Sequence, residues 1–245
     1  MRKSLASIAV AAALAVPTLA AAQAAAPSPV TGNVSLVSDY RFRGLTQTFE
    51  EPALQGGFDY AHSSGFYVGN WNSSIADTFF GGSPLEMDFY AGYKPTFGDI
   101  TLDLGILYYY YPGSNAPGIG KIDNTELYAG ATWKWLSAKY FHAVSDFFGV
   151  DDTKGSNYID LTATVPFGAG WGLVGHIGHQ KVKNNSDADY TDYKIGITKD
   201  IRGWVLGAAF VDTDADDAIY TATSGGGKTM NVGDSTVVFS ISKTF

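Results

Sequence analysis

Hydrophobic and polar side chains alternate along most of the chain with a period of two residues. The alternation is clearest near the C-terminus, where Val237, Phe239 and Ile241 alternate with Ser240 and Ser242. This pattern is typical of a β-strand with one apolar and one polar face. Twelve such segments predict twelve strands, at residues 31–43, 52–61, 66–75, 85–94, 100–111, 123–134, 137–147, 157–167, 171–181, 190–199, 203–211 and 234–245.

The connections between these segments alternate between short turns and longer polar loops. An even number of strands with short turns at one end is typical of an antiparallel barrel in the bacterial outer membrane. The last strand has no following segment to cover its edge, and an unpaired backbone group in hydrocarbon costs several kcal/mol, so it must pair with the first strand. The fold class predicted is therefore all-β, a transmembrane antiparallel β-barrel.

Aromatic residues gather near the ends of the apolar faces. Such belts mark the two interfaces of a bilayer with water. The expected belt residues are Tyr93, Trp133, Phe167, Trp171 and Phe245 near the short turns, and Tyr40, Phe42, Tyr108 and Tyr110 near the long loops. The pattern leaves open which face of segments 66–75, 137–147 and 203–211 points outward.

The N-terminal residues predict a signal peptide and therefore export. Residues 1–22 combine Arg2 and Lys3, an apolar stretch and a small-residue cleavage site near Ala22, which predicts a signal peptide. Residues 23–30 are expected to form a flexible lead-in and residues 31–245 the barrel domain, in the outer membrane of a Gram-negative bacterium. After the leader, no stretch reaches the roughly 18 consecutive apolar residues of a membrane helix. The chain has no cysteine, so no disulfide is possible.

The charge balance argues against one class of partner. Removing the leader takes away Arg2 and Lys3 and no acidic residue, so the 16 basic residues become 14 against 24 acidic ones, a net charge of −10. An acidic protein does not bind the phosphate backbone well, so no nucleic acid partner is expected.

Several motifs resemble a known family. They are residues 37–44 (VSDYRFRG), 65–71 (GFYVGNW), 138–140 (AKY) with Ser145 and Asp146, and the terminal aromatic. These resemble the TorF family of porins, proteobacterial outer-membrane β-barrel proteins, over the whole mature chain. The resemblance implies the barrel and its location, and it transfers no catalytic residue.

Charged side chains of both signs fall on the polar faces of the predicted strands. The candidate pore-lining residues are Asp39, Arg41, Arg43, Asp59, Glu86, Asp88, Lys94, Asp103, Glu126, Asp160, His176, Asp192 and Lys194. Such side chains could set the ion preference of a water-filled lumen, or they could form an ion network that fills a narrow barrel. Twelve strands lie between eight, whose interior is filled, and sixteen, which leave an open channel. The expected function is passive diffusion of small hydrophilic solutes or ions; the alternative is a plugged structural or surface-interaction barrel.

An embedded hydrolase is a third hypothesis, because a twelve-stranded outer-membrane phospholipase is a known architecture. A serine nucleophile would need a histidine within hydrogen-bond reach. His142 and Ser145 are three residues apart on one strand and therefore point to opposite faces. His176 faces inward, with Asp160 as a possible neighbour, but the sequence specifies no serine beside it. His179 lies on the other face from His176, so the two cannot bind one metal. We therefore expect no enzyme, no cofactor and no catalytic or metal site.

The longest loop opens with an acidic run, Asp212, Asp214, Asp216 and Asp217. The run lacks the glycine and the distal glutamate of a calcium loop, which favours a solvated acidic loop. The expected partners are outer-membrane lipid and lipopolysaccharide, small hydrophilic solutes, and the barrel-assembly machinery through the strand that ends in Phe245.

Overall fold

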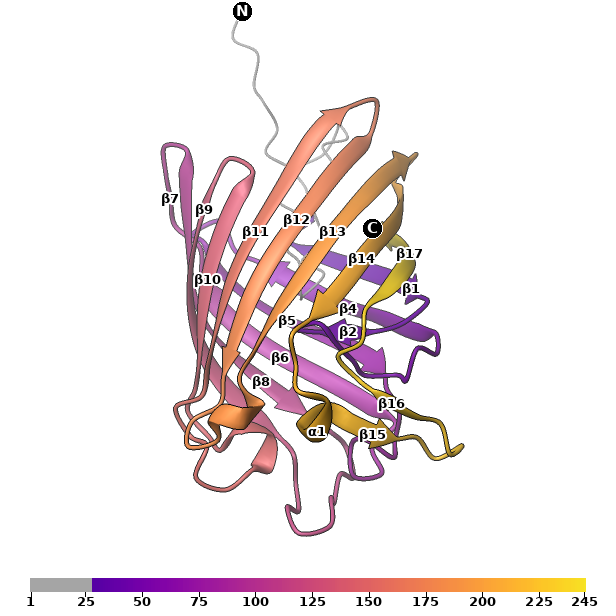
Figure 1. Ribbon diagram of the computed structural model, residues 1–245. Coiled ribbons are helices and arrows are strands. Elements are labelled where there is room, and N and C mark those ends of the chain that lie inside the picture. Colours follow the sequence, from indigo (N-terminus) through magenta and orange to yellow (C-terminus); the bar gives the residue numbers. More distant parts are fainter. Residues whose placement is uncertain (1–27) are drawn as a thin grey trace, which may run out of the picture.

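The computed structural model describes residues 28–245. In it, twelve antiparallel strands form the closed wall of a barrel (Figure 1). The wall strands are β1 (Val30–Val37), β4 (Ala53–Ala61), β5 (Phe66–Ser74), β6 (Leu85–Tyr93), β8 (Ile100–Tyr110), β9 (Asn124–Trp133), β10 (Leu136–Ala143), β11 (Asn157–Gly168), β12 (Trp171–Lys181), β13 (Tyr190–Ile201), β14 (Trp204–Thr213) and β17 (Thr236–Thr244). The predicted twelve-stranded antiparallel barrel is confirmed. The predicted signal peptide and most of the lead-in lie outside the described residues.

The first and last strands close the wall. β1 pairs with β17 from Asn33 opposite Thr244 to Val37 opposite Ser240. The backbone N–H of Phe245 donates to the Gly32 carbonyl at 2.9 Å, and that of Gly32 donates to the Phe245 carbonyl at 2.8 Å. Closure removes both free edges, which a sheet in hydrocarbon requires.

The two ends of the barrel differ. Short turns and the C-terminus lie at one end, and the long connections lie at the other (Figure 1). The loop end carries the small elements η1 (Phe147–Gly149), η2 (Ser186–Ala188), α1 (Asp217–Tyr220), β15 (Thr221–Thr223) and β16 (Thr229–Asn231), and β7 (Thr96–Phe97) extends the turn between β6 and β8. Within residues 28–245, no helix is long and apolar enough to span a bilayer.

Side chains alternate between the outer surface and the interior as the pattern predicted. The structure also shows which face points outward in the three segments where the pattern left this open. In β5, Phe66 and Val68 point outward and Trp71 points inward. Tyr140 of β10 and Trp204 of β14 point outward. The interior holds a cluster of buried aromatic side chains, which includes Tyr40, Trp71, Phe80, Tyr109, Tyr111, Tyr128, Phe141 and Tyr158.

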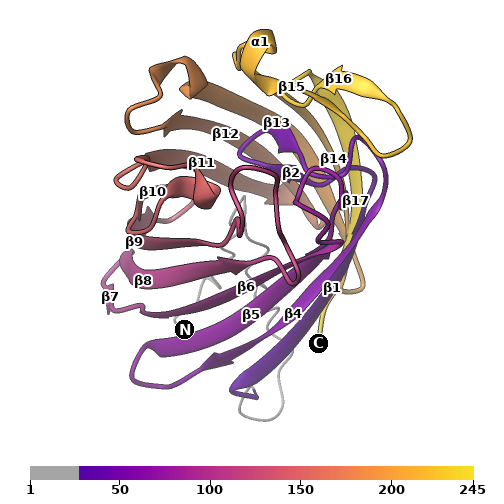
Figure 2. The same cartoon turned by 90° about the horizontal axis from the view of Figure 1, so that it is seen from below.

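One predicted strand was too long. β1 ends at Val37, and residues 38–52 leave the wall and fold into the barrel as a hairpin of β2 (Arg41–Phe42) and β3 (Leu45–Thr46) (Figure 2). Placing Tyr40 and Phe42 in the outer aromatic belt was therefore wrong, because both pack against the interior aromatic cluster. An alternating segment fits an inward hairpin as well as it fits a wall strand, so the pattern could not separate the two.

Glycine is required at position 57, where β4 pairs closely with β5. A Cβ at Gly57 would lie 2.0 Å from the Asn70 carbonyl oxygen and 2.8 Å from Trp71 Cα. Both are backbone atoms, which cannot move without distorting the ladder. A Cβ at Gly175, in contrast, would meet nothing within 4 Å.

We expect Gly57→Ala to lower the free energy of unfolding by about 2 kcal/mol or more, because overpacking here displaces backbone. Urea titration of the protein in lipid vesicles measures this. Gly175→Ala is the matched control and should unfold at the parent's urea concentration. A Gly57→Ala protein as stable as the parent would contradict the close approach.

Candidate functional site

Residues 38–52, which we call the inner segment, divide the barrel interior. The segment turns at Arg43 and Gly44, whose φ angles are 48° and 84°. A Cβ at Gly44 would lie 2.4 Å from Thr213 Cγ2 and 2.7 Å from Asp192 Cβ. The left-handed backbone and the close approach to the opposite wall both favour glycine at this turn.

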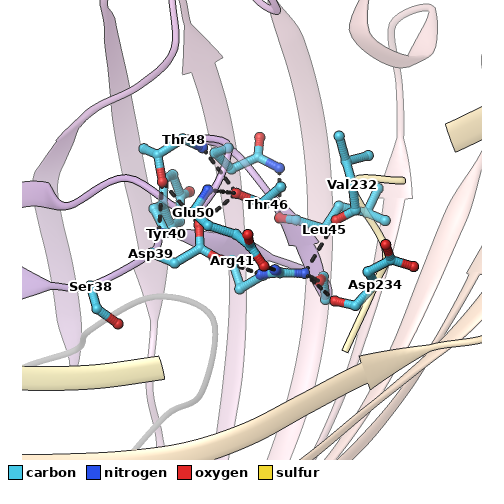
Figure 3. A network of polar contacts seen from close by, with 12 residues as sticks. Ser38, Asp39, Tyr40, Arg41, Leu45, Thr46, Thr48, Glu50, Val232 and Asp234 are labelled. Carbon is cyan, nitrogen blue, oxygen red and sulfur yellow. Dashed lines mark hydrogen bonds and ion pairs between the residues drawn. The ribbon is translucent and has the colours of Figure 1, made fainter. Parts of the chain in front are cut away.

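Polar contacts fix the base of the inner segment (Figure 3). The Asp39 carboxylate accepts hydrogen bonds from Thr46 Oγ1 at 2.5 Å and from Thr48 Oγ1 at 3.0 Å, and it accepts one from Arg41 Nε at 2.5 Å. Arg41 Nη1 also donates to the carbonyls of Val232 and Asp234, at 3.2 and 2.8 Å. The segment is therefore tied to the loop that precedes β17.

The tip of the inner segment reaches across the interior. Arg43 Nη2 lies 2.6 Å from Glu126 Oε2 on β9, and Arg43 Nη1 donates to Gln180 Oε1 on β12 at 2.7 Å. The guanidinium also lies 4.3 Å from the ring centroid of Tyr158. Burial lowers the pKa of Arg43, but Glu126, together with Tyr109 and Tyr158, outweighs this and raises that pKa above its ordinary value. Arg43 is thus a permanent cation that connects the inner segment to three wall strands, β9, β11 and β12.

Three predicted acidic residues meet beside this contact. Glu86 and Asp88 point inward from β6 and Glu126 from β9, all nearly or fully buried. Tyr40 Oη donates to Glu86 Oε1 at 2.9 Å. Glu86 Oε2, both Asp88 oxygens and Glu126 Oε1 have no hydrogen-bond partner within the described part of the chain. Carboxylates held close together repel one another, so adding charge here is costly.

A second ion cluster lies nearer the short turns. Asp103 Oδ2 is 2.9 Å from Lys139 Nζ and 3.6 Å from Lys94 Nζ, and Asp103 Oδ1 accepts a hydrogen bond from Tyr67 Oη at 2.6 Å. Asp59 accepts one from the Tyr90 hydroxyl, also at 2.6 Å. Lys139 was not among the sequence candidates because the facing of its strand was undecided.

The inward histidine sits between two carboxylates. His176 Nδ1 lies 3.1 Å from Asp160 Oδ2, as the sequence suggested, and His176 Nε2 lies 2.8 Å from Asp192 Oδ1. The Thr162 hydroxyl is 3.0 Å from the His176 Nδ1 atom but also donates to Asp160 Oδ1. Among residues 28–245, the polar contacts of His176 include no serine, and the arrangement is that of a buried ion cluster.

Acidic side chains of the longest loop support its local structure. Asp214 accepts the Thr191 backbone N–H at 2.5 Å, and Asp216 caps α1 by accepting the Ala218 N–H at 2.8 Å. In the described part of the chain, no group of three or more histidine or acidic side chains is placed to hold a metal ion.

A cavity of about 280 Å³ remains on the side of the interior that these clusters leave free. The inner segment borders it through Asp39, Tyr40 and Arg41, and Lys194 projects from β13. The facing wall carries small side chains, namely Gly196, Gly207, Ala209, Ser240 and Ser242. Small residues of β14 border this cavity, and no local pattern in the sequence indicates that they face open space.

The structure thus places all thirteen candidate residues inside the barrel, although Asp39, Arg41 and Arg43 come from the inner segment and not from a wall strand. Placing these three on the polar face of the first strand was wrong, because β1 ends at Val37. Of the remaining ten, nine lie on wall strands and Lys94 directly follows the end of β6 at Tyr93. The contacts above join most of them into three clusters.

Comparisons with known proteins support the fold. Residues 21–245 match a family described as a bacterial protein of unknown function (Gcw_chp). The NanC porin is similar in structure, with a TM-score of 0.54 and 10% identity, covering 88% of this chain and 98% of NanC. The KdgM porin in complex with disordered oligogalacturonate has a TM-score of 0.50 and 6% identity, covering 88% and 97%. No curated protein matches the chain. At these identities the porins show the fold alone, and the resemblance to porins holds at that level without confirming the TorF name.

We expect Glu126→Gln to lower the free energy of unfolding by about 3 kcal/mol, because it leaves the buried Arg43 cation without its partner. Glu86→Gln is the matched comparison and should change stability by less than about 1 kcal/mol, since it removes a charge from a carboxylate cluster and keeps an acceptor for Tyr40. The midpoints of urea unfolding distinguish the two. Equal losses in both variants would show that the Arg43 pair is not the critical contact.

Proposed function

The chain belongs to the Gcw_chp family of bacterial proteins, and we propose that it is a porin-like channel of the outer membrane. Small hydrophilic solutes or ions diffuse passively through its narrow, mixed-charge lumen. The observation that supports this most is the cavity between the inner segment and the small side chains of β13, β14 and β17. A solute path here runs off-centre, because the inner segment and the aromatic cluster fill the other half of the barrel.

The charges around this path are few and of both signs. Asp39 and Arg41 face it from the inner segment, and Lys194 faces it from the wall. Most of the other interior charges are held in the three clusters, where partners offset them. Lys194 is therefore the charge best placed to act on a passing ion without anchoring the inner segment.

Phe245 and the apolar outer face of the barrel fit insertion into the outer membrane. The terminal aromatic, Phe245, is well exposed at the short-turn end of β17, where it is available to the barrel-assembly machinery. The outward apolar face suits outer-membrane lipid, with lipopolysaccharide around the loop end. An enzymatic role has no comparable support, because the inward histidine is held by two carboxylates.

In a planar lipid bilayer, the purified protein should give discrete conductance steps. Ala209→Trp should reduce the single-channel conductance roughly by half or more, because the indole fills the proposed path. Leu206→Trp, on the outward face of the same strand, is the control and should conduct like the parent. A parent protein that never conducts would favour the plugged structural barrel instead.

Reversing the charge of Lys194 tests the mixed-charge lumen. Lys194→Glu should shift the reversal potential in a salt gradient toward cation preference, since ion selectivity follows the charges that line a path. Lys134→Glu, at an exposed short turn, should leave the reversal potential unchanged. Arg41 and Arg43 are poor probes, because both anchor the inner segment. A Lys194→Glu channel with the parent's reversal potential would place the path elsewhere.

A further inference from the structure

Two lysine–tryptophan pairs of the same geometry lie on the outer face of the barrel near the short turns. Lys199 of β13 stands directly opposite Trp171 of β12, and Lys243 of β17 stands directly opposite Trp204 of β14. The Nζ atom of Lys199 lies 4.8 Å from the ring centroid of Trp171, and that of Lys243 lies 5.0 Å from the ring centroid of Trp204. Both distances are those of a cation–π contact, which holds each ammonium group over its ring.

Both pairs face the bilayer at the level of the lipid headgroups. Trp171 and Trp204 begin their strands at the short-turn end and are 39% and 42% exposed. Lys199 and Lys243 share the face of the outward isoleucines of their strands and lie within two residues of the ends of β13 and β17. Tryptophan suits this depth because its ring is apolar and its N–H is polar. The two ammonium groups therefore lie where hydrocarbon gives way to headgroups.

Neither ammonium group has an acidic partner in the part of the chain that the structure describes. Lys199 Nζ donates to the Ala169 carbonyl, and neither Lys199 nor Lys243 takes part in a salt bridge within residues 28–245. The nearest acidic residue in sequence, Asp200, is held in its own turn, where Oδ1 accepts the Gly203 backbone N–H at 3.0 Å. The positive charge of each lysine is therefore not offset by a carboxylate of the chain.

A third lysine near the short turns differs in this respect. Lys134 Nζ lies 4.9 Å from the ring centroid of Trp133, but Asp99 Oδ2 lies 4.0 Å from the same nitrogen. The Lys134 side chain is also 54% exposed in the turn between β9 and β10. It has a carboxylate and water as partners, so it has no need of a lipid.

The unpaired lysines stand out against the charge of the whole chain. The mature chain is acidic, and residues 212–217 of the longest loop contain four aspartates and no basic residue. At the short-turn end of β13, β14 and β17, in contrast, Lys199, Arg202 and Lys243 face a single acidic side chain, Asp200. This sector of the rim is basic, which complements an anionic partner.

We propose that the two pairs bind the phosphate groups of anionic phospholipids in the leaflet at the short-turn end, one lipid to each pair. The proposal rests on the outer-membrane location proposed above. Each ammonium group donates to phosphate oxygens, and the indole beside it packs against the glycerol and the first acyl carbons. An anionic headgroup is preferred to a zwitterionic one, because the latter carries its own cation, which competes with the lysine for the phosphate.

The spacing of the pairs allows two lipids. Lys199 is level in the register with Ile241, so Lys199 and Lys243 are separated by two strands and two residues. At about 4.8 Å between strands and about 3.3 Å per residue, their Cα atoms are roughly 12 Å apart. Both side chains lean toward the preceding strand, so the two ammonium groups do not converge on one phosphate.

Native mass spectrometry tests the site with the protein in mild detergent and equal amounts of phosphatidylglycerol and phosphatidylcholine. The parent should retain two lipids and favour phosphatidylglycerol about fivefold, the effect of one basic residue near an anionic headgroup. Lys199→Gln and Lys243→Gln should each retain one phosphatidylglycerol. The double variant should show no preference between the two lipids.

A matched control removes the same charge from the other end of the barrel. Lys181→Gln with Lys183→Gln, at the loop end of β12, should retain two lipids with the parent's preference, and so should Lys134→Gln. A parent without preference for phosphatidylglycerol would overturn the site, as would equal lipid loss in the loop-end control and in the double variant.

The readout is independent of conduction, so a barrel that passes no ions can still retain the two lipids. A parent that stays in solution without detergent would overturn the membrane location and this site together. A parent that inserts into membranes but binds both lipids equally would overturn the site alone.

Discussion

Hydrocarbon offers no hydrogen-bond partner, so every backbone group at membrane depth must find one within the sheet. The seam between β1 and β17 meets this requirement, and the remainder of the structure depends on it. Closure fixes the alternation of the whole wall, because a slip of one residue at any pair would send apolar side chains inward. The outward face is accordingly apolar, and the charges collect inside.

The interior is filled unevenly. The inner segment, anchored by Asp39 and Arg41, carries Arg43 across to Glu126 and Gln180. A buried ion pair gains little net stability because both charges lose water, but it fixes the position of the segment that carries it. Bulky aromatic and charged side chains crowd toward β6, β8, β9 and β11. Small side chains face the interior from β14, from β17 and from Gly196 of β13. This division leaves a cavity of about 280 Å³ beside the inner segment, through which we propose that solutes pass.

The wall could be predicted from the sequence, because period-two alternation and turn lengths are local properties. The register also brought His176 next to Asp160, since adjacent strands align their inward positions. The conformation of residues 38–43 could not be predicted, because their alternation suits both a wall strand and an inward hairpin. Arg43 and Gln180 are 137 residues apart, and nothing local specifies such a pair. The off-centre cavity was missed for the same reason, since it results from what the opposite wall leaves empty.

The water accessibility of single cysteines along β17 distinguishes most directly between a lipid-facing outer wall and a water-filled interior. Ser240 and Ser242 border the cavity, while Phe239 and Ile241, which alternate with them along the strand, face outward. In intact outer membranes, a small charged thiol reagent should label Ser240→Cys and Ser242→Cys quickly, and should leave Phe239→Cys and Ile241→Cys unlabelled. Uniform labelling of all four would contradict a wall in lipid. Protection of all four would contradict a water-filled passage.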